Sequence, residues 1–113
     1  MSGITTHVLD VSHGRPAAGV PVTLEVEAVG GWQSVGKGIT NADGRISNLV
    51  PADSPIAAGV YRLTFDTGTY FANGDIQGFY PQVTVVFKIE ISTQHYHVPL
   101  LLSPFGYSTY RGS

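Results

Sequence analysis

The C-terminal stretch of the chain reads His95-Tyr-His-Val-Pro-Leu-Leu-Leu-Ser-Pro-Phe-Gly-Tyr-Ser-Thr-Tyr-Arg-Gly-Ser113. Ser103-Pro104 and Gly106 are typical turn residues, and they separate an apolar run from a second extended segment. The pattern therefore predicts two short strands joined by a turn, with the second strand running to the last residue. His95 and His97 lie two residues apart, so a strand would present both imidazoles on one face.

The closing strand is expected to carry different side chains on its two faces. One face would hold Tyr107, Thr109 and Arg111, and the other would hold Ser108, Tyr110 and Gly112. Chain ends are usually poorly ordered, whereas this one finishes on an aromatic ring, a guanidinium, a glycine and a hydroxyl. We therefore expect the terminal residues to form part of a site. Pro99, inside the first of the two strands, predicts an edge position or a bulge there.

The rest of the chain repeats the short alternating pattern of half-buried strands. Further strands are expected at residues 4–11, 22–29, 32–39, 61–66 and 83–91. The first of these places His7 on one face with Leu9 and Val11. Residues 40–44 predict a turn, and residues 70–73 one short helix. Short strands separated by regular turns predict an all-β, antiparallel sandwich in a single domain over residues 1–113, with no parallel sheet.

Composition excludes several classes of partner. Charged residues make up 12% of the 113 residues, against roughly 25% in an average domain, so we expect another subunit to bury part of the surface. The net charge is −2 and no basic run occurs, which argues against nucleic acid and anionic membranes as partners. The absence of Cys excludes disulfides and thiolate chemistry. Without a secretory signal pattern or a spanning apolar segment, the expected location is the cytoplasm.

Three of the four histidines, His7, His95 and His97, lie on predicted strands. Each by itself is expected to be a structural or surface residue, as is His13 in a polar loop. The His95-x-His97 pair with a third imidazole also fits a zinc site, although no carboxylate or thiol accompanies the pair. Considered alone, Arg45 after the 40–44 turn predicts a solvated charge.

Five segments together resemble the transthyretin-related family, and specifically its 5-hydroxyisourate hydrolases. They are Thr6-His7-Val8-Leu9-Asp10, Asn41-Ala-Asp-Gly-Arg45, Gly59-Val-Tyr-Arg-Leu-Thr-Phe-Asp66, Phe79-Tyr-Pro81 and residues 95–113. The resemblance covers nearly the whole chain. Its middle segments recur in many sandwich modules, and the two ends are the specific part.

This resemblance implies a transthyretin-like sandwich of two four-stranded sheets with one short helix. It also implies a homotetramer with a site in a central channel at the dimer–dimer interface. The site residues that it implies are His7, Arg45, His97 and Ser113 for catalysis, and Tyr110, Arg111 and Gly112 for substrate binding. No metal and no cofactor is implied.

The implied reaction is the hydrolysis of 5-hydroxyisourate in urate breakdown, in which water attacks a cyclic amide carbonyl. A neutral His can act as the base, and Arg45 can stabilise the negative charge that develops on the carbonyl oxygen. The sequence does not decide which His is the base. The alternative is a transthyretin-like carrier that binds a small molecule in the same channel.

Overall fold

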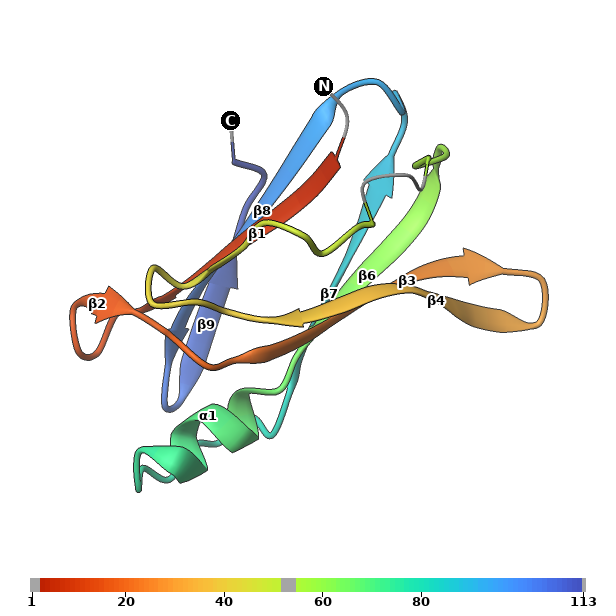
Figure 1. The fold of residues 1–113 in the computed structure, drawn as a ribbon. Coiled ribbons are helices and arrows are strands. Elements are labelled where there is room, and N and C mark those ends of the chain that lie inside the picture. The colour runs from red at the N-terminus through yellow and green to blue at the C-terminus, as the bar shows by residue number, and fades with distance from the viewer. Residues whose placement is uncertain (1–2, 52–54, 113) are drawn as a thin grey trace.

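The computed structural model describes residues 3–51 and 55–112. Its elements in chain order are β1 (Gly3–Asp10), β2 (Arg15–Pro16), β3 (Pro21–Ala28), β4 (Gly31–Ile39), β5 (Arg45–Ile46), β6 (Gly59–Phe65), α1 (Thr67–Asn73), β7 (Val83–Ile89), β8 (His95–Ser103) and β9 (Gly106–Thr109). They form the predicted sandwich with one short helix in the described part of the chain (Figure 1).

The two sheets are built from different parts of the chain. One has the order β4-β3-β6-β7 and is antiparallel throughout. The other has the order β2-β1-β8-β9, and β5 adds a fifth strand beside β1. Two details differ from the sequence prediction. This sheet has five strands instead of four, and β1 and β8 run parallel. Alternation reports the faces of a strand but not the direction of its neighbour.

The apolar faces of the two sheets meet in one core. Val8 and Leu100 from one sheet and Leu24, Leu63 and Phe65 from the other are fully buried. On β1 the buried and half-buried residues alternate strictly. Because the core uses one face of each strand, the other face of β1 and β8 is left for a site.

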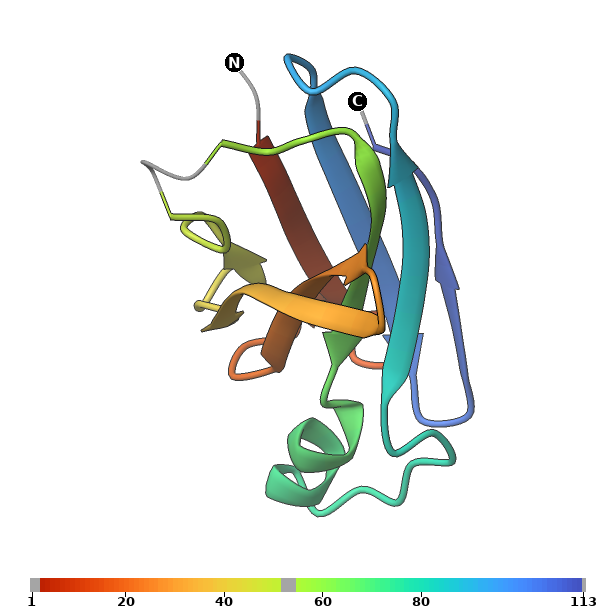
Figure 2. The same ribbon diagram turned by 90° about the vertical axis from the view of Figure 1, so that its right-hand side faces the viewer.

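Helix α1 closes one end of the sandwich, opposite the loop between β7 and β8 (Figures 1 and 2). Asp66 caps the helix by accepting hydrogen bonds from Thr69 N at 3.1 Å and Thr69 Oγ1 at 2.8 Å. Phe71 inserts into the core. The Tyr70 hydroxyl donates to Asp10 Oδ2 at 2.6 Å, which ties the helix to the end of β1. No helix within residues 3–51 and 55–112 has the length and hydrophobicity needed to cross a membrane.

The strand that contains Pro99 differs from the prediction. β8 is an inner strand between β1 and β9, so Pro99 lies neither at an edge nor at a bulge. The Pro99 carbonyl accepts a hydrogen bond from Thr109 Oγ1 at 2.7 Å and therefore faces β9. The nitrogen and the carbonyl of a strand residue point to the same side, so the Pro99 nitrogen, which has no hydrogen to donate, faces β9 as well. The regular β8–β9 pairing ends at Thr109 and resumes as a single bridge between His97 and Gly112. The closing strand therefore stops at Thr109, short of the predicted last residue.

Candidate active site

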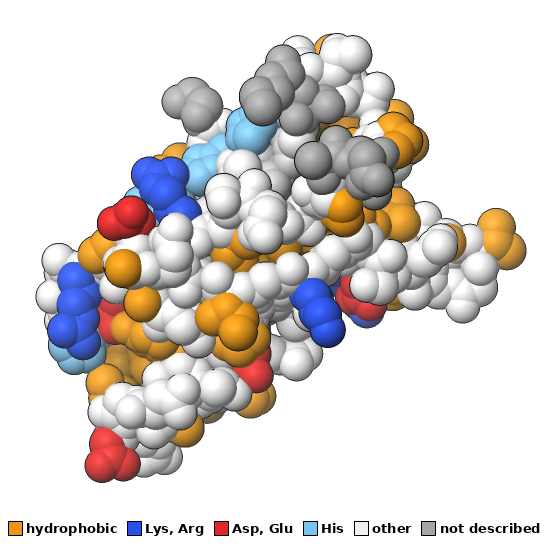
Figure 3. Space-filling model, viewed as in Figure 1, with side chains coloured by type: hydrophobic (Ala, Val, Ile, Leu, Met, Phe, Trp, Pro, Cys, Tyr) orange, Lys and Arg blue, Asp and Glu red, His pale blue; other side chains and the backbone are white. Residues whose placement is uncertain are grey.

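The outer face of β1 and β8 brings together the histidines of the two chain ends. The parallel register places Thr5 beside His97, Gly3 beside His95 and His7 beside Pro99. His7 and His97 are half-buried, and His95 is exposed. Histidine side chains gather next to Lys or Arg side chains on this side of the molecule (Figure 3). The predicted pairing of His7 and His97 on one surface is therefore a direct consequence of β1 and β8 being neighbours.

Arg45 joins this face through the short strand β5. The register pairs Arg45 with His7 and Ile46 with Thr6. Ile46 and Thr6 are buried, and Arg45 is exposed, so Arg45 lies on the same outer face as His7. The sequence predicts a solvated charge for Arg45, and Arg45 is indeed exposed. The residue pattern does not predict that His7 is its neighbour.

The turn before Arg45 has one conformation that its residues enforce. Asn41 Oδ1 accepts from Asp43 N at 2.9 Å and from Arg45 N at 3.0 Å. Gly44 has a φ of +74°, and a Cβ there would lie 2.4 Å from the Val8 carbonyl oxygen. Only glycine fits both the left-handed backbone and this close approach. The Gly44 carbonyl in turn accepts from Val8 N at 2.8 Å, which fixes the turn, and with it Arg45, against β1.

Thr5 links the two imidazoles of the His95-x-His97 pair. Its Oγ1 lies 2.9 Å from His95 Nε2 and 2.8 Å from His97 Nδ1. Sequence analysis did not identify Thr5 as a site residue. The alternation along β1 places Thr5 on the same face as His7. This pattern would identify Thr5 as a site residue only with the added knowledge that β8 is the parallel neighbour of β1.

The surroundings of His97 favour the neutral form of its ring. Burial lowers the pKa of its imidazole below the ordinary value of 6.5, and the charge of Arg45 and the imidazoles of His7 and His95 lower it further. The backbone of Thr5 has the opposite effect on this pKa but does not outweigh burial and the neighbouring groups. A neutral imidazole can accept a proton from water at neutral pH, and an adjacent guanidinium can stabilise an oxyanion. The geometry therefore suits general-base hydrolysis.

Gly112 packs directly against the His97 ring. Its N–H donates to the His97 carbonyl at 2.8 Å. A Cβ at Gly112 would lie 2.6 Å from His97 Cδ2, so any side chain at this position would have to displace the ring. The predicted site residue Gly112 thus lies next to His97, and its lack of a side chain is what allows the contact.

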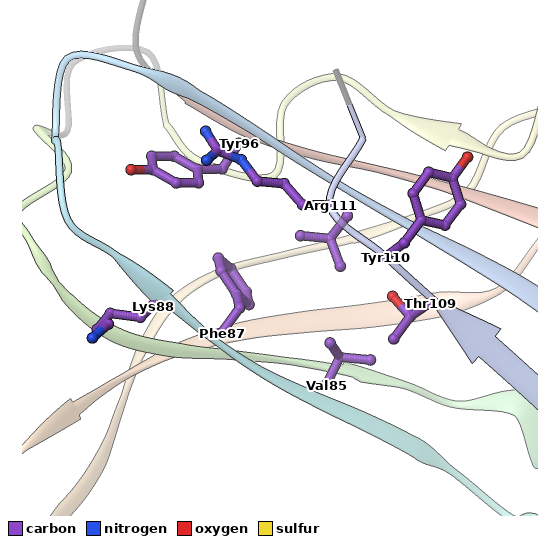
Figure 4. A pocket seen from close by; sticks show the side chains of 8 residues that line it. Val85, Phe87, Lys88, Tyr96, Thr109, Tyr110 and Arg111 are labelled. Carbon is purple, nitrogen blue, oxygen red and sulfur yellow. The ribbon is translucent and has the colours of Figure 1, made fainter.

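The structure places Arg111 away from His7, His97 and Arg45. Its guanidinium carbon lies 4.4 Å from the centre of the Tyr96 ring, and Nη2 donates to Gln94 Oε1 at 3.2 Å. Tyr96 belongs to the core face of β8, so Arg111 points to the opposite side of the sheet from His97. Tyr110 is exposed. Both residues also line a cavity of about 250 Å³ (Figure 4), whose other walls are Val85, Phe87, Lys88, Tyr96, Val98 and Thr109.

The remaining predictions concern Ser113, metal binding and His13. Ser113 lies outside the described residues. Within residues 3–51 and 55–112, no three His, Cys, Asp or Glu side chains form a group that could hold a metal ion. His13 Nδ1 lies 2.9 Å from Asp10 Oδ2, which agrees with the structural role expected for it.

Comparison with known proteins gives consistent similarities along the whole chain. The model of the family described as HIUase/Transthyretin family matches residues 4–112. A 5-hydroxyisourate hydrolase of Halalkalibacterium halodurans is 49% identical over 119 residues, covering 100% of both chains. The structure of Klebsiella pneumoniae 5-hydroxyisourate hydrolase aligns with a TM-score of 0.85 and 40% identity, covering 100% of this chain and 94% of that one. Sea bream transthyretin in complex with thyroxine aligns with a TM-score of 0.90 and 37% identity, covering 96% and 93%.

Proposed function

The chain belongs to the HIUase/transthyretin family, and we propose that it hydrolyses 5-hydroxyisourate to 2-oxo-4-hydroxy-4-carboxy-5-ureidoimidazoline in urate breakdown. Relatives named 5-hydroxyisourate hydrolase match nearly all of it. The observation that carries the proposal is the position of His7, Arg45 and His97 on one outer face of the β1–β8 sheet. That face combines a proton acceptor with a fixed positive charge.

In this proposal an imidazole of the site removes a proton from water, which attacks the cyclic amide carbonyl of the substrate. A positioned base contributes about 10²–10⁴-fold to such a reaction. Arg45 stabilises the oxyanion, because its guanidinium is always charged and presents several donors. Ser113 takes part in catalysis, and Tyr110, Arg111 and Gly112 bind the substrate, with Arg111 turning toward the site in the assembled protein. The reaction consumes only water and needs no cofactor or metal.

The proposed active form is a homotetramer in the cytoplasm, with sites at the dimer–dimer interface. Two features of the chain support assembly. Charged residues are only 12% of the chain, and large apolar side chains such as Val86, Phe105 and Tyr110 are 59%, 71% and 60% exposed. Exposed apolar surface of this kind often marks a protein interface.

A carrier function is the second candidate, because sea bream transthyretin in complex with thyroxine shares the fold. A carrier of an apolar ligand would be expected to line its site with apolar side chains. The face formed by β1, β5 and β8 instead presents Thr5, His7, Arg45, His95 and His97. This polarity favours the hydrolase.

The test is to follow freshly prepared 5-hydroxyisourate by ultraviolet absorbance with and without the protein. The wild type should accelerate the decay, and His97→Asn, His7→Asn and Arg45→Gln should each lower turnover by about 10²-fold with little change in melting temperature. Decay at the spontaneous rate, together with tight thyroxine binding, would replace the hydrolase with the carrier. Dialysis against a chelator should leave the rate unchanged, and a loss that zinc restores would show a metal-dependent reaction.

A further inference from the structure

Thr5 has a hydroxyl placed between two imidazoles. The oxygen lies 2.9 Å from His95 Nε2 and 2.8 Å from His97 Nδ1, and both are ordinary hydrogen-bond lengths. A threonine hydroxyl carries one proton and accepts through its lone pairs. It can donate to only one of the two imidazoles, so at least one ring must donate an N–H to it when both hydrogen bonds are made. The protonation states of the two rings are coupled through this one side chain.

Two contacts fix which nitrogen of His97 is free to react. Nδ1 is bound to Thr5, and the Cδ2 edge of the ring lies against Gly112. Nε2 is the remaining ring nitrogen, and it can accept a proton only if it carries none itself. A neutral His97 with a bare Nε2 must hold its proton on Nδ1, where it is donated to Thr5. The Thr5 hydroxyl then has its own proton available to donate to His95 Nε2.

We propose that Thr5 is a positioning residue that holds His97 as the tautomer with the proton on Nδ1, so that Nε2 is the base of the reaction. This inference rests on the proposed hydrolase function and deepens it, because it selects His97 over His7. His95 completes the arrangement as the acceptor for the Thr5 hydroxyl. In many hydrolytic sites a neighbouring group holds the catalytic base in the correct orientation and tautomer.

The surroundings of His97 support this tautomer. Arg45 from β5, His7 from β1 and His95 from β8 all act electrostatically on the His97 ring. The guanidinium of Arg45 can only donate hydrogen bonds, and its charge disfavours an additional proton on the ring. A bare Nε2 is compatible with this cation, and His95 is exposed.

The kinetic test compares Thr5→Val, which keeps the shape without the hydroxyl, with Thr5→Ser, which keeps the hydroxyl. Thr5→Val should lower kcat by about 10-fold or more at nearly unchanged KM, because the base is left in the wrong tautomer in most of the molecules. Thr5→Ser should stay within about threefold of the wild type, the residual loss reflecting its freer side-chain rotation. Equal losses in both variants, or no loss in Thr5→Val, would overturn the proposal.

A second readout does not depend on activity. Nitrogen NMR of the His97 ring should show Nδ1 protonated and Nε2 bare in the wild type and in Thr5→Ser. In Thr5→Val the signal should shift toward the Nε2-protonated form, which imidazole side chains ordinarily favour. A wild-type His97 that is protonated on Nε2 would contradict the inference. If the wild type shows the expected tautomer but does not hydrolyse 5-hydroxyisourate, the proposed function fails and the positioning role of Thr5 stands.

Thr6→Val is the matched control. Thr6 is the adjacent threonine on β1, but its hydroxyl faces the core and donates to the Val98 carbonyl at 2.7 Å. Its replacement should lower stability without changing the His97 tautomer or the kcat of the folded protein. A change of tautomer in Thr6→Val as large as that in Thr5→Val would show that general loosening of β1 is responsible, and the proposal would be withdrawn.

Discussion

His97 is held on two sides, and each contact depends on one particular neighbouring residue. Thr5 occupies one edge of the ring with its hydroxyl, and Gly112 leaves space for the other edge. Gly112 also donates to the His97 carbonyl, so the backbone of the terminal segment is tied to the ring that it borders. The position of the His97 ring is therefore set by residues that have no acid–base chemistry of their own.

Gly112→Ala should test this arrangement at the residue scale. The added Cβ would lie 2.6 Å from His97 Cδ2, so the ring must move. We expect turnover to fall by about 10-fold or more, because small displacements of a catalytic group carry large rate penalties. The melting temperature should change little, since the segment is at the surface. Gly106→Ala is the control, because the nearest atom to its Cβ, Ser103 Oγ, is 3.7 Å away; an equal loss in both variants would contradict the explanation.

The lowered pKa of His97 predicts the acid limb of the pH–rate profile. The proposed reaction uses the neutral His97 ring, so the acid limb of kcat/KM should lie below pH 6.5, where the folded protein takes up the proton. Arg45 contributes to this shift after burial. Arg45→Gln should therefore move the limb to higher pH, and Arg45→Lys should keep it near the wild-type position. The measurement is kcat/KM from pH 4 to pH 8, and an unmoved limb in Arg45→Gln would refute the electrostatic cause.

At the scale of elements, β1 connects the site to the far end of the sandwich. Its outer face carries Thr5 and His7, and its last residue, Asp10, anchors α1 through Tyr70. Asp10 also accepts from Ser12 and lies beside His13. Burial raises the pKa of Asp10, but the hydrogen bonds from Tyr70, Ser12 and His13 outweigh it and lower the value from 3.8 to about 2. Burial and the bond to Asp10 raise the pKa of Tyr70 to about 12.

This depressed pKa predicts acid sensitivity. Between about pH 4 and pH 2 the unfolded state binds a proton at Asp10 and the folded state does not, so stability falls as pH falls. The loss attributable to Asp10 should be about 2 kcal/mol. Asp10→Asn should be less stable at pH 7 and should lack this part of the pH dependence. Asp43→Asn, which changes an exposed carboxylate, is the control, and urea unfolding at several pH values provides the measurement. A wild-type slope retained in Asp10→Asn would rule out Asp10 as its source.

At the scale of the whole molecule, the proposed site is an open face and not an enclosed pocket. Arg45 and His95 are exposed, and His7 and His97 are half-buried. A single chain therefore gives little exclusion of water around a substrate. A second subunit packed over the face formed by β1, β5 and β8 would enclose it, which is why the assembly belongs to the functional proposal.

Sedimentation at micromolar protein concentration should show a tetramer. We expect this association because large apolar side chains are left exposed on the single chain, and such surface often marks an interface. Specific activity should also fall on dilution into the range where the tetramer dissociates. A monodisperse monomer with full specific activity would contradict the assembly and leave the open face as the complete site.

The sequence by itself determined the parts of this protein that depend on neighbours along the chain. Alternation predicted the strands and their buried faces, Asn41, Asp43 and Gly44 predicted the turn before Arg45, and the chemistry of the two chain ends predicted the family. These features follow from local backbone preferences and side-chain periodicity, which a single segment displays by itself.

Only the tertiary structure decided which segments lie side by side. The parallel pairing of β1 with β8 puts Thr5 between His95 and His97, and no pattern within either strand contains that information. The sequence predicts an edge position or a bulge for Pro99, yet Pro99 lies on an inner strand, next to the point where the regular β8–β9 pairing ends. The register pairs Gly112 with His97, so the preceding residue, Arg111, points to the other face of the sheet and contacts Tyr96. Strand partners and registers come from burying the whole core at once, so they are properties of the packed molecule.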